Sequence, residues 1–345
     1  MIGFCIQGST PSLHAWADLN EPTVFSGPEL TLPKAAVQYG GWEHRESHNL
    51  YGFYQQMAAA DGLVTRSGGS ERPFVLSRAF FAGTQRLGAV WTGDNLSTWE
   101  YLKISIPTCL SMCVTDISFC GADIGGFVPK PSPELLVRWY QAACLQPFFR
   151  GHSSMNTERR EPWLFKEEVT DAIRSVIVER YRLLPYWYTL FYQAHTDGLP
   201  VLRPLWMEFP QEQSIFIVAH QYMLGEALMA CPVTESGVTE LEVLFPGAEQ
   251  LWYDVKSAEV HQGGGTLRFP VTLETPGEVG NYKCGAAVRS VDILGVRAEP
   301  SAVRVHAAGG AEGVSVEFEY DPEQRKLSVG NLELAGDDDW DIQIC

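Results

Sequence analysis

The sequence is poor in positive charge and has no long apolar run. Its 345 residues hold 25 Lys and Arg against 42 Asp and Glu, a formal net charge of −17. An acidic surface repels phosphate backbones and anionic lipid, so neither nucleic acid nor a membrane surface is an expected partner. No apolar stretch reaches the roughly 18 residues that cross a bilayer. We therefore expect no membrane span.

Cysteine is also scarce, and the usual metal and phosphate motifs are missing. Eight cysteines are too few for a disulfide scaffold of this length, and no CxxC pair occurs. Cys109 and Cys113 could share a helix face, but no second ligand pair follows. His44 and His48 have the spacing of zinc-binding helices, yet Arg45 stands where a metalloprotease needs Glu. We therefore expect no metal site.

The first ten residues lack both a charged region and a long apolar region. A secretory signal peptide needs both. We therefore expect no signal peptide at this start of the chain.

The composition favours a packed protein that handles neutral polar ligands. Hydrophobic residues make up 45% of the chain, enough for a sizeable core. Aromatic residues make up 12%, with 10 Trp, beside abundant carboxylates. Sugars stack on aromatic rings and donate hydrogen bonds to carboxylates, so a sugar is a reasonable ligand class.

Short apolar strands alternate with helical stretches over the first 200 residues. Strands are predicted at 14–18, 73–77, 88–91, 117–120 and 146–149, and helices at 47–66, 99–112, 133–144 and 168–195, the last broken at Pro185 and ended at Gly198. This alternation predicts a parallel α/β architecture. A doubly wound sheet is the alternative to a (β/α)₈ barrel, but its glycine-rich phosphate turn is absent.

The character of the sequence changes near residue 216. Alternating apolar and polar residues at 239–246, 251–255 and 266–271 predict short antiparallel strands, and strands resume between 316 and 344. We therefore expect the barrel at 13–215 and a β-sandwich region at 216–345.

Two carboxylates end separate predicted strands. Asp18 ends the strand 14–18 and precedes a turn at Pro22. Asp94 lies in the loop that directly follows the strand 88–91. Carboxylates on two strand ends of a barrel can flank one sugar bond, where one attacks the anomeric carbon and the other protonates the leaving oxygen. The alternative is that each caps a helix or holds a loop.

Five segments resemble the glycoside hydrolase family 31 α-glucosidases, and among these the neutral α-glucosidases. They are WADLNEPTVF (16–25), RPFVLSRAFFAG (72–83), GAVWTGDN (88–95), FCGADIGGF (119–127) and QPFFRGH (146–152). Ala17 and Leu19 depart from the family pattern, which has Asn and Met there. The resemblance implies an incomplete (β/α)₈ TIM barrel, from about strand four to strand eight, followed by a C-terminal β-sandwich domain. Residues 1–12 lie outside it, and an internal deletion is expected near 274–284.

The resemblance also assigns roles to individual residues. Asp18 would be the nucleophile and Asp94 the general acid and base, with Glu21 supporting Asp18. The residues implied to bind the sugar are Arg78, Trp91, Asp123, Phe127 and His152.

The implied activity is hydrolysis of terminal α-linked glucose, α-1,4 or α-1,3, by a retaining double displacement without a cofactor. The substrate would be an oligosaccharide, either a maltooligosaccharide derived from glycogen or an N-glycan. A chain of the N-glycan-processing type would work in the endoplasmic reticulum with a non-catalytic β subunit, and otherwise in the cytoplasm. The alternative is an inactive truncated chain that binds glycans or a partner.

Overall fold

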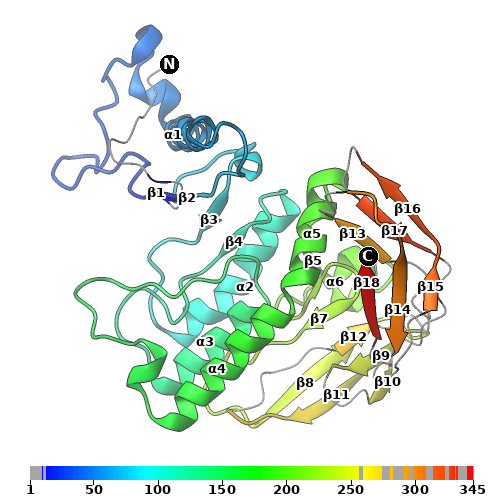
Figure 1. Ribbon diagram of the computed structural model, residues 1–345. Coiled ribbons are helices and arrows are strands. Elements are labelled where there is room, and N and C mark those ends of the chain that lie inside the picture. Colours follow the sequence, from blue (N-terminus) through cyan, green and yellow to red (C-terminus); the bar gives the residue numbers. More distant parts are fainter. Residues whose placement is uncertain are drawn as a thin grey trace. The chain divides into compact units, whose positions relative to one another are not determined.

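The computed structural model describes residue 10 and residues 13–255, 259–273, 280–282, 291–294, 298–307, 314–322, 326–330, 332 and 340–344. The chain divides into two compact units, Met1–Tyr282 and Lys283–Cys345. Figure 1 shows the elements of both units along the chain. The units are described separately below.

A parallel sheet forms the first part of the larger unit (Figure 1). Its strands, in spatial order, are β1 (Ala15–Ala17), β2 (Val75–Ser77), β3 (Ala89–Trp91) and β4 (Cys120–Gly121). Every neighbouring pair is parallel. The crossovers contain α1 (His44–Arg66) and α2 (Trp99–Val114), and α3 (Pro133–Cys144) follows β4. The predicted parallel α/β fold is therefore confirmed.

The segment expected to be a strand at 146–149 does not form a regular ladder. It still lies beside β4, because the Phe148 amide donates to the Cys120 carbonyl at 3.0 Å and the Ile124 amide donates to the Arg150 carbonyl at 3.0 Å. The chain nevertheless continues the parallel order by one further segment.

The helix ends follow local sequence signals. α1 begins three residues earlier than predicted, since Glu43 and Glu46 form a reciprocal capping box ahead of it. The predicted long helix is two helices, α4 (Glu167–Arg182) and α5 (Leu184–Asp197), broken just before Pro185. Gly198 follows α5 with φ +68°, which confirms the predicted stop.

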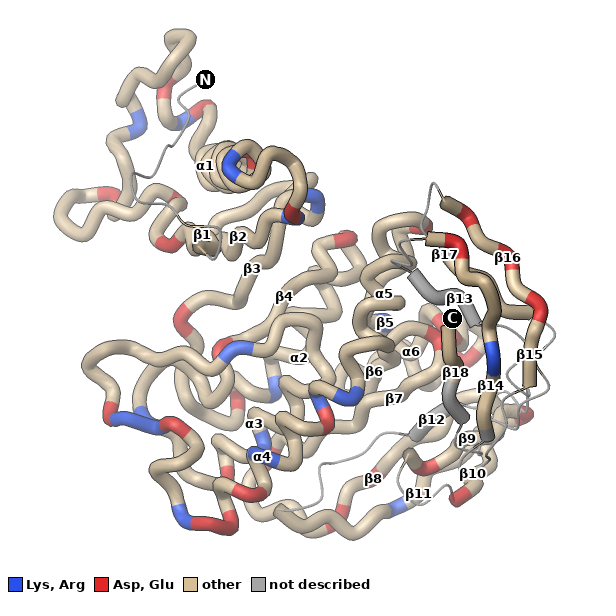
Figure 2. Tube along the Cα trace, in the orientation of Figure 1, with Lys and Arg blue, Asp and Glu red and all other residues tan. Residues whose placement is uncertain are grey.

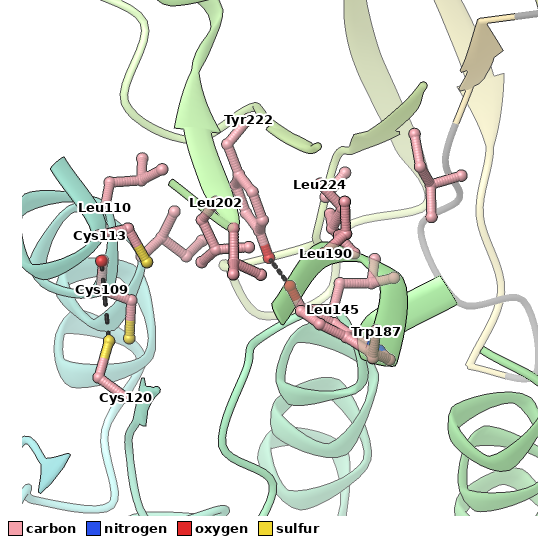
Figure 3. Close-up of a cluster of buried hydrophobic side chains, with 14 of the residues drawn as sticks. Cys109, Leu110, Cys113, Cys120, Leu145, Trp187, Leu190, Leu202, Tyr222 and Leu224 are labelled. Atoms are coloured by element: carbon pink, nitrogen blue, oxygen red, sulfur yellow. Dashed lines mark hydrogen bonds between the residues drawn. The ribbon is translucent and has the colours of Figure 1, made fainter. Parts of the chain in front are cut away.

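Buried cysteines and aromatic residues join α2, α5 and the antiparallel strands into one core (Figure 3). Cys109, Cys113 and Cys120 are at most 1% exposed and are free thiols, as expected of small buried hydrophobic residues. The hydroxyl of fully buried Tyr222 donates to the Leu145 carbonyl at 3.0 Å. A second core packs α3 against α4 through residues that include Leu136.

An antiparallel sheet completes the larger unit. Its spatial order is β10 (Val260–Gln262), β9 (Leu251–Asp254), β12 (Gly280–Tyr282), β7 (Leu228–Ala230), β6 (Tyr222–Leu224) and β5 (Leu202–Pro204). A separate two-stranded antiparallel sheet pairs β8 (Glu240–Phe245) with β11 (Gly265–Pro270). A short helix, α6 (Leu205–Glu208), follows β5, and 3₁₀ turns occur at Tyr39–Gly41, Thr84–Arg86, Pro162–Leu164 and Gln213–Ile215.

The smaller unit contains two three-stranded antiparallel sheets. One has the order β13 (Val291–Leu294), β17 (Lys326–Val329), β16 (Phe318–Asp321), and the other β15 (Val314–Val316), β14 (Val303–Ala307), β18 (Trp340–Ile344). Val303, Val305, Leu327 and Val329 form its core. The deletion expected near 274–284 falls largely outside the described residues.

Charged residues are dispersed over the described chain. Figure 2 shows Lys and Arg scattered among more numerous Asp and Glu residues, on helices and loops alike. Among the described residues, no helix combines the length and apolar character needed to cross a membrane.

Candidate active site

Asp18, Glu21 and Arg78 meet at the carboxyl ends of β1 and β2. Arg78 follows β2 directly, and its amide donates to the Ala17 carbonyl at 3.1 Å. Its guanidinium binds Glu21 in a bidentate manner, with Nε–Oε1 at 2.7 Å and Nη2–Oε2 at 3.0 Å. Buried Asn20 fastens this turn to β2, since its Nδ2 donates to Ser77 Oγ at 2.7 Å.

The same guanidinium faces both candidate catalytic carboxylates. Arg78 Nη1 lies 3.3 Å from Asp18 Oδ1 and 3.9 Å from Asp94 Oδ2. Because both oxygens lie within 4 Å of one nitrogen, they are less than about 8 Å apart. The structure therefore brings together the two carboxylates that the sequence placed on separate strand ends. Asp18 is 38% and Asp94 53% exposed, so both can be reached by a ligand.

Glu21 and Arg78 stabilise each other's charge. Partial burial acts to raise the pKa of Glu21, but hydrogen bonds from Arg78 and Thr23 leave it below the ordinary value. The hydrogen bond to Glu21 raises the pKa of Arg78, and the charges of Asp18 and Asp94 add to this. Arg78 is therefore a fixed cation between the two other carboxylates.

A close backbone approach ties the loop of Asp94 to the loop that follows β4. The Phe127 amide donates to the Asn95 carbonyl at 2.6 Å, and the Ser97 amide donates to the Val128 carbonyl at 2.8 Å. Gly126 makes this approach possible, because it has φ +78° and a Cβ there would lie 2.6 Å from the Ser97 backbone. The two loops therefore form one assembly.

Asp123 is the buried carboxylate of the site. Its side chain is 1% exposed, and Arg150 Nη2 donates to its Oδ1 at 2.5 Å. Its second oxygen, Oδ2, is buried without a hydrogen-bond partner. Burial raises the pKa of Asp123 to about 6, against the charge of Arg150 and with a contribution from Asp94.

Aromatic rings line the other side of the site. The His152 ring lies 5.5 Å from Phe127 in a stacked arrangement and 5.0 Å from Trp16 edge to face. Trp16 in turn lies 5.9 Å from Trp91. Burial lowers the pKa of His152, as does the charge of Arg150, while Asp18 and Asp94 oppose this shift. The residues that the resemblance assigned to catalysis and sugar binding therefore occupy one region.

Sequence reasoning missed Trp16 and Arg150 as parts of this region. The Arg150 guanidinium lies 5.1 Å from the ring centres of both Trp16 and Trp91 while it binds Asp123. A signal for both residues was present. Trp16 lies two residues before Asp18, and Arg150 lies two residues before His152, which in an extended strand places each pair on one face.

His44 and His48, which have the spacing of a zinc-binding motif, contact each other and a neighbouring glutamine. His44 is buried, and its Nδ1 lies 3.0 Å from Gln38 Nε2 while its Nε2 lies 2.8 Å from His48 Nδ1. Both ring nitrogens of His44 are therefore occupied by protein partners. In the described part of the chain, no group of three or more His, Cys, Asp or Glu side chains is placed to hold a metal ion.

A parallel sheet with carboxylates at its strand ends is an arrangement that glycoside hydrolases use, and the family comparison assigns the chain to that class. Residues 10–190 match the glycosyl hydrolases family 31 TIM-barrel domain, and residues 198–310 match the glycosyl hydrolase family 31 C-terminal domain. The chain is a member of glycoside hydrolase family 31, as its sequence motifs predicted.

Several of the similar proteins are named as α-glucosidases. The chain is 60% identical to neutral alpha-glucosidase C of Mus musculus over 78% of its length and 45% identical to that of Macaca fascicularis over 98%. It spans 30% of the mouse protein and 54% of the macaque protein. A crystal structure of the ER glucosidase II heterodimeric complex, consisting of catalytic subunit and the binding domain of regulatory subunit, matches 98% of this chain and 46% of its own, at 29% identity and a TM-score of 0.78.

Proposed function

We propose that the protein hydrolyses terminal α-linked glucose with retention of configuration at the anomeric carbon. The observation that carries this proposal is the single Arg78 guanidinium that faces both Asp18 and Asp94. A cation within 4 Å of two carboxylates attracts both, and so holds them close enough together to flank one glycosidic bond. The α-glucosidase names of the relatives support the same activity.

In this mechanism Asp18 attacks the anomeric carbon while Asp94 donates a proton to the departing glycosidic oxygen. The products are a β-linked glucosyl ester on Asp18 and a released alcohol. Asp94, now ionised, then takes a proton from water as that water attacks the same carbon. The second displacement restores the α configuration and frees Asp18. Arg78 holds Asp18, and Glu21 holds Arg78.

The remaining residues suit the recognition of one glucose unit. Oδ2 of Asp123 has no hydrogen-bond partner, and a sugar hydroxyl that displaces the groups covering it would supply one. The ring of His152 offers a further polar atom. Trp91 and Phe127 supply apolar faces to the same region, on which a pyranose ring can lie. We propose that these four residues bind the glucose that is released.

The wider context follows from the relatives by analogy. The match to a glucosidase II catalytic subunit supports an oligosaccharide substrate and a regulatory β subunit as partner. Hydrolysis of maltose compared with nigerose would distinguish α-1,4 from α-1,3 preference. The alignment with the macaque protein extends over 415 residues for a 345-residue chain, which supports the deletion proposed near 274–284.

The second candidate function is a non-catalytic chain that binds glycans or a partner. The exposure of Asp94, 53%, favours it, because water around a carboxylate weakens its interaction with the reacting sugar. The substitutions described next distinguish the two candidate functions. Only if Asp18 and Asp94 are catalytic will replacing each of them change the configuration of the product.

The decisive experiment uses Asp18→Ala and Asp94→Ala with azide, in the longest natural form that contains these residues. Both variants should lose at least about 10³-fold in turnover of an activated α-glucoside. Azide should restore part of the activity in each. It should yield the β-glucosyl azide with Asp18→Ala, because azide replaces the nucleophile, and the α-glucosyl azide with Asp94→Ala, because azide replaces water.

Asp61→Asn on the exposed surface of α1 is the control and should keep full turnover. Product configuration is read by nuclear magnetic resonance. Wild-type turnover that survives Asp18→Ala, or the same anomer from both variants, would refute these assignments. Glycan binding without any turnover in the wild type would support the second candidate.

A further inference from the structure

Arg160 is a buried cation outside the residues assigned to catalysis or sugar binding. Its side chain is 8% exposed, yet among the described residues no carboxylate oxygen lies within 4.0 Å of its guanidinium. Burial lowers the pKa of Arg160, and the charge of Asp123 opposes this shift. A buried charge without a direct partner is costly unless hydrogen bonds satisfy it.

Backbone carbonyls satisfy Arg160 instead. Its Nη1 donates to the Gly125 carbonyl at 3.0 Å, and its Nη2 donates to the carbonyls of Gly126 and His152. The Ser97 hydroxyl lies 3.5 Å from Nη1, at the limit of a hydrogen bond. One side chain therefore contacts three segments that lie far apart in the sequence.

These three segments carry the groups of the site. Gly125 and Gly126 lie between Asp123 and Phe127, and the carbonyl of His152 belongs to the residue whose ring stacks on Phe127. We propose that Arg160 is a positioning residue, which locks the loop of Asp123 and Phe127 to the segment of His152 and so sets the geometry of the glucose-binding region. This inference rests on the function proposed above.

The local backbone explains why such a lock is needed. Gly125 and Gly126 both have positive φ, +84° and +78°, and glycine loses the most conformational freedom when it is fixed. Gly126 permits the close approach to Ser97, but neither glycine restrains the loop by itself. A planar guanidinium with several donors in fixed directions can restrain several carbonyls at once, which a lysine ammonium cannot do as well.

Arg180 provides a matched comparison within the same chain. It is 7% exposed and donates to the carbonyls of Cys144, Gln146 and Pro147 at 2.6–2.8 Å. It thus holds the beginning of the 146–152 segment, whereas Arg160 holds its end, where the site lies. Both are buried arginines that donate hydrogen bonds to several backbone carbonyls, and of the two only Arg160 contacts the site loops. Arg180 also lies 4.4 Å from the ring centre of Trp187.

Hydrogen exchange tests the lock in the 345-residue chain without reference to activity. In Arg160→Met, peptides covering 122–128 and 152–155 should exchange at least about tenfold faster than in the wild type, with 144–148 unchanged. In Arg180→Met, peptides covering 144–148 should exchange faster, and those covering 122–128 and 152–155 should be unchanged. Unchanged exchange of 122–128 in Arg160→Met, or equal acceleration everywhere in both variants, would overturn the proposal.

Kinetics then tests the consequence for the site. In the longest natural form, Arg160→Lys should lower kcat/KM for 4-nitrophenyl α-glucoside by about 10–100-fold, with a raised KM, and Arg180→Lys should change it by less than threefold. The kcat/KM of Arg160→Met should be lower than that of Arg160→Lys, because lysine keeps some of the N–H donors of arginine and methionine keeps none. A loss below threefold in Arg160→Lys, or equal losses in both lysine variants, would overturn the proposal. A wild type without hydrolysis would refute the proposed function, and the exchange data alone would then decide on the lock.

Discussion

If Asp123 binds sugar as proposed, the protonation state that favours binding is not the one that favours the folded protein. Its burial raises its pKa to about 6 in the folded protein, whereas an exposed Asp titrates near 3.8. Between these values the unfolded chain ionises more readily than the folded one, so the folded state is disfavoured as the pH rises. The ionised form, however, is the stronger acceptor for sugar hydroxyls.

We predict that stability falls as the pH rises from about 4 to 7 and that this part of the fall depends on Asp123. The shift corresponds to about 3 kcal/mol in the free energy of unfolding. Asp123→Asn lacks this contribution. Its free energy of unfolding, relative to that of the wild type, should therefore rise by up to this amount between pH 4 and pH 7. Urea unfolding of both proteins at pH 4, 5, 6 and 7 measures it. If the free energies of unfolding of the two proteins changed with pH in the same way, Asp123 would not titrate in this range.

Single-residue roles could be predicted only where a motif carried them. Asp18, Arg78 and Asp94 stand in segments long enough to be specific, and the structure places them within reach of one another. Trp16 and Arg150 stand in the same segments, but nothing in their type separates them from residues that fill a core or solvate a surface. The contact of Arg150 with both rings depends on strand register, which cannot be read from spacing along the chain.

At the scale of loops, Gly126 controls the contact between the loops of Asp94 and Phe127. We predict that Gly126→Ala destabilises the fold by roughly 3 kcal/mol or more, because a Cβ would meet backbone atoms of Leu96 and Ser97 that cannot move aside. Gly198→Ala is the control, since Gly198 has a similar φ of +68° but open space around its Cβ. It should cost only about 1 kcal/mol.

Thermal or urea unfolding of the two glycine variants compares them directly. Equal losses would mean that only the left-handed backbone matters and that the two loops are not in tight contact. The comparison is sharp because both glycines share the backbone conformation and differ in their neighbours.

Element positions were largely predictable, and the exceptions have local causes. Hydrophobic periodicity located α1, α2 and α3, and Pro185 marked the break between α4 and α5. α1 begins three residues before its predicted start, because the capping box of Glu43 and Glu46 lies ahead of the apolar pattern. The order of the antiparallel sheet, in which β12 lies between β9 and β7, joins strands distant in sequence and could not be predicted from local patterns.

At the scale of the whole molecule, β1 lies at an edge of the parallel sheet, and Trp16 on it is 48% exposed. We predict that the 345-residue chain expressed alone turns over 4-nitrophenyl α-glucoside at least about 100-fold more slowly than full-length mouse neutral alpha-glucosidase C. Water can reach Asp94 from the open side, and an unpaired strand edge favours association. A hundredfold loss corresponds to about 2.7 kcal/mol in the barrier.

The comparison requires equal amounts of folded protein, checked by circular dichroism and by size-exclusion chromatography. Turnover within tenfold of the full-length enzyme would show that the four described parallel strands suffice for the pocket. It would also contradict the argument from the exposure of Asp94.

The half-exposed indole of Trp16 gives the protein a built-in optical probe. It lies 5.0 Å from the His152 ring and beside the Arg150 cation, at the edge of the proposed glucose-binding region. A bound sugar would replace water over the ring, so the emission of Trp16 should shift to shorter wavelength on titration with a glucose mimic such as 1-deoxynojirimycin. Subtracting the Trp16→Phe spectrum isolates this signal from the other nine tryptophans. Identical difference spectra with and without the mimic would mean that no ligand covers this face. Occupancy could thus be followed by light alone, even in a variant that no longer turns over substrate.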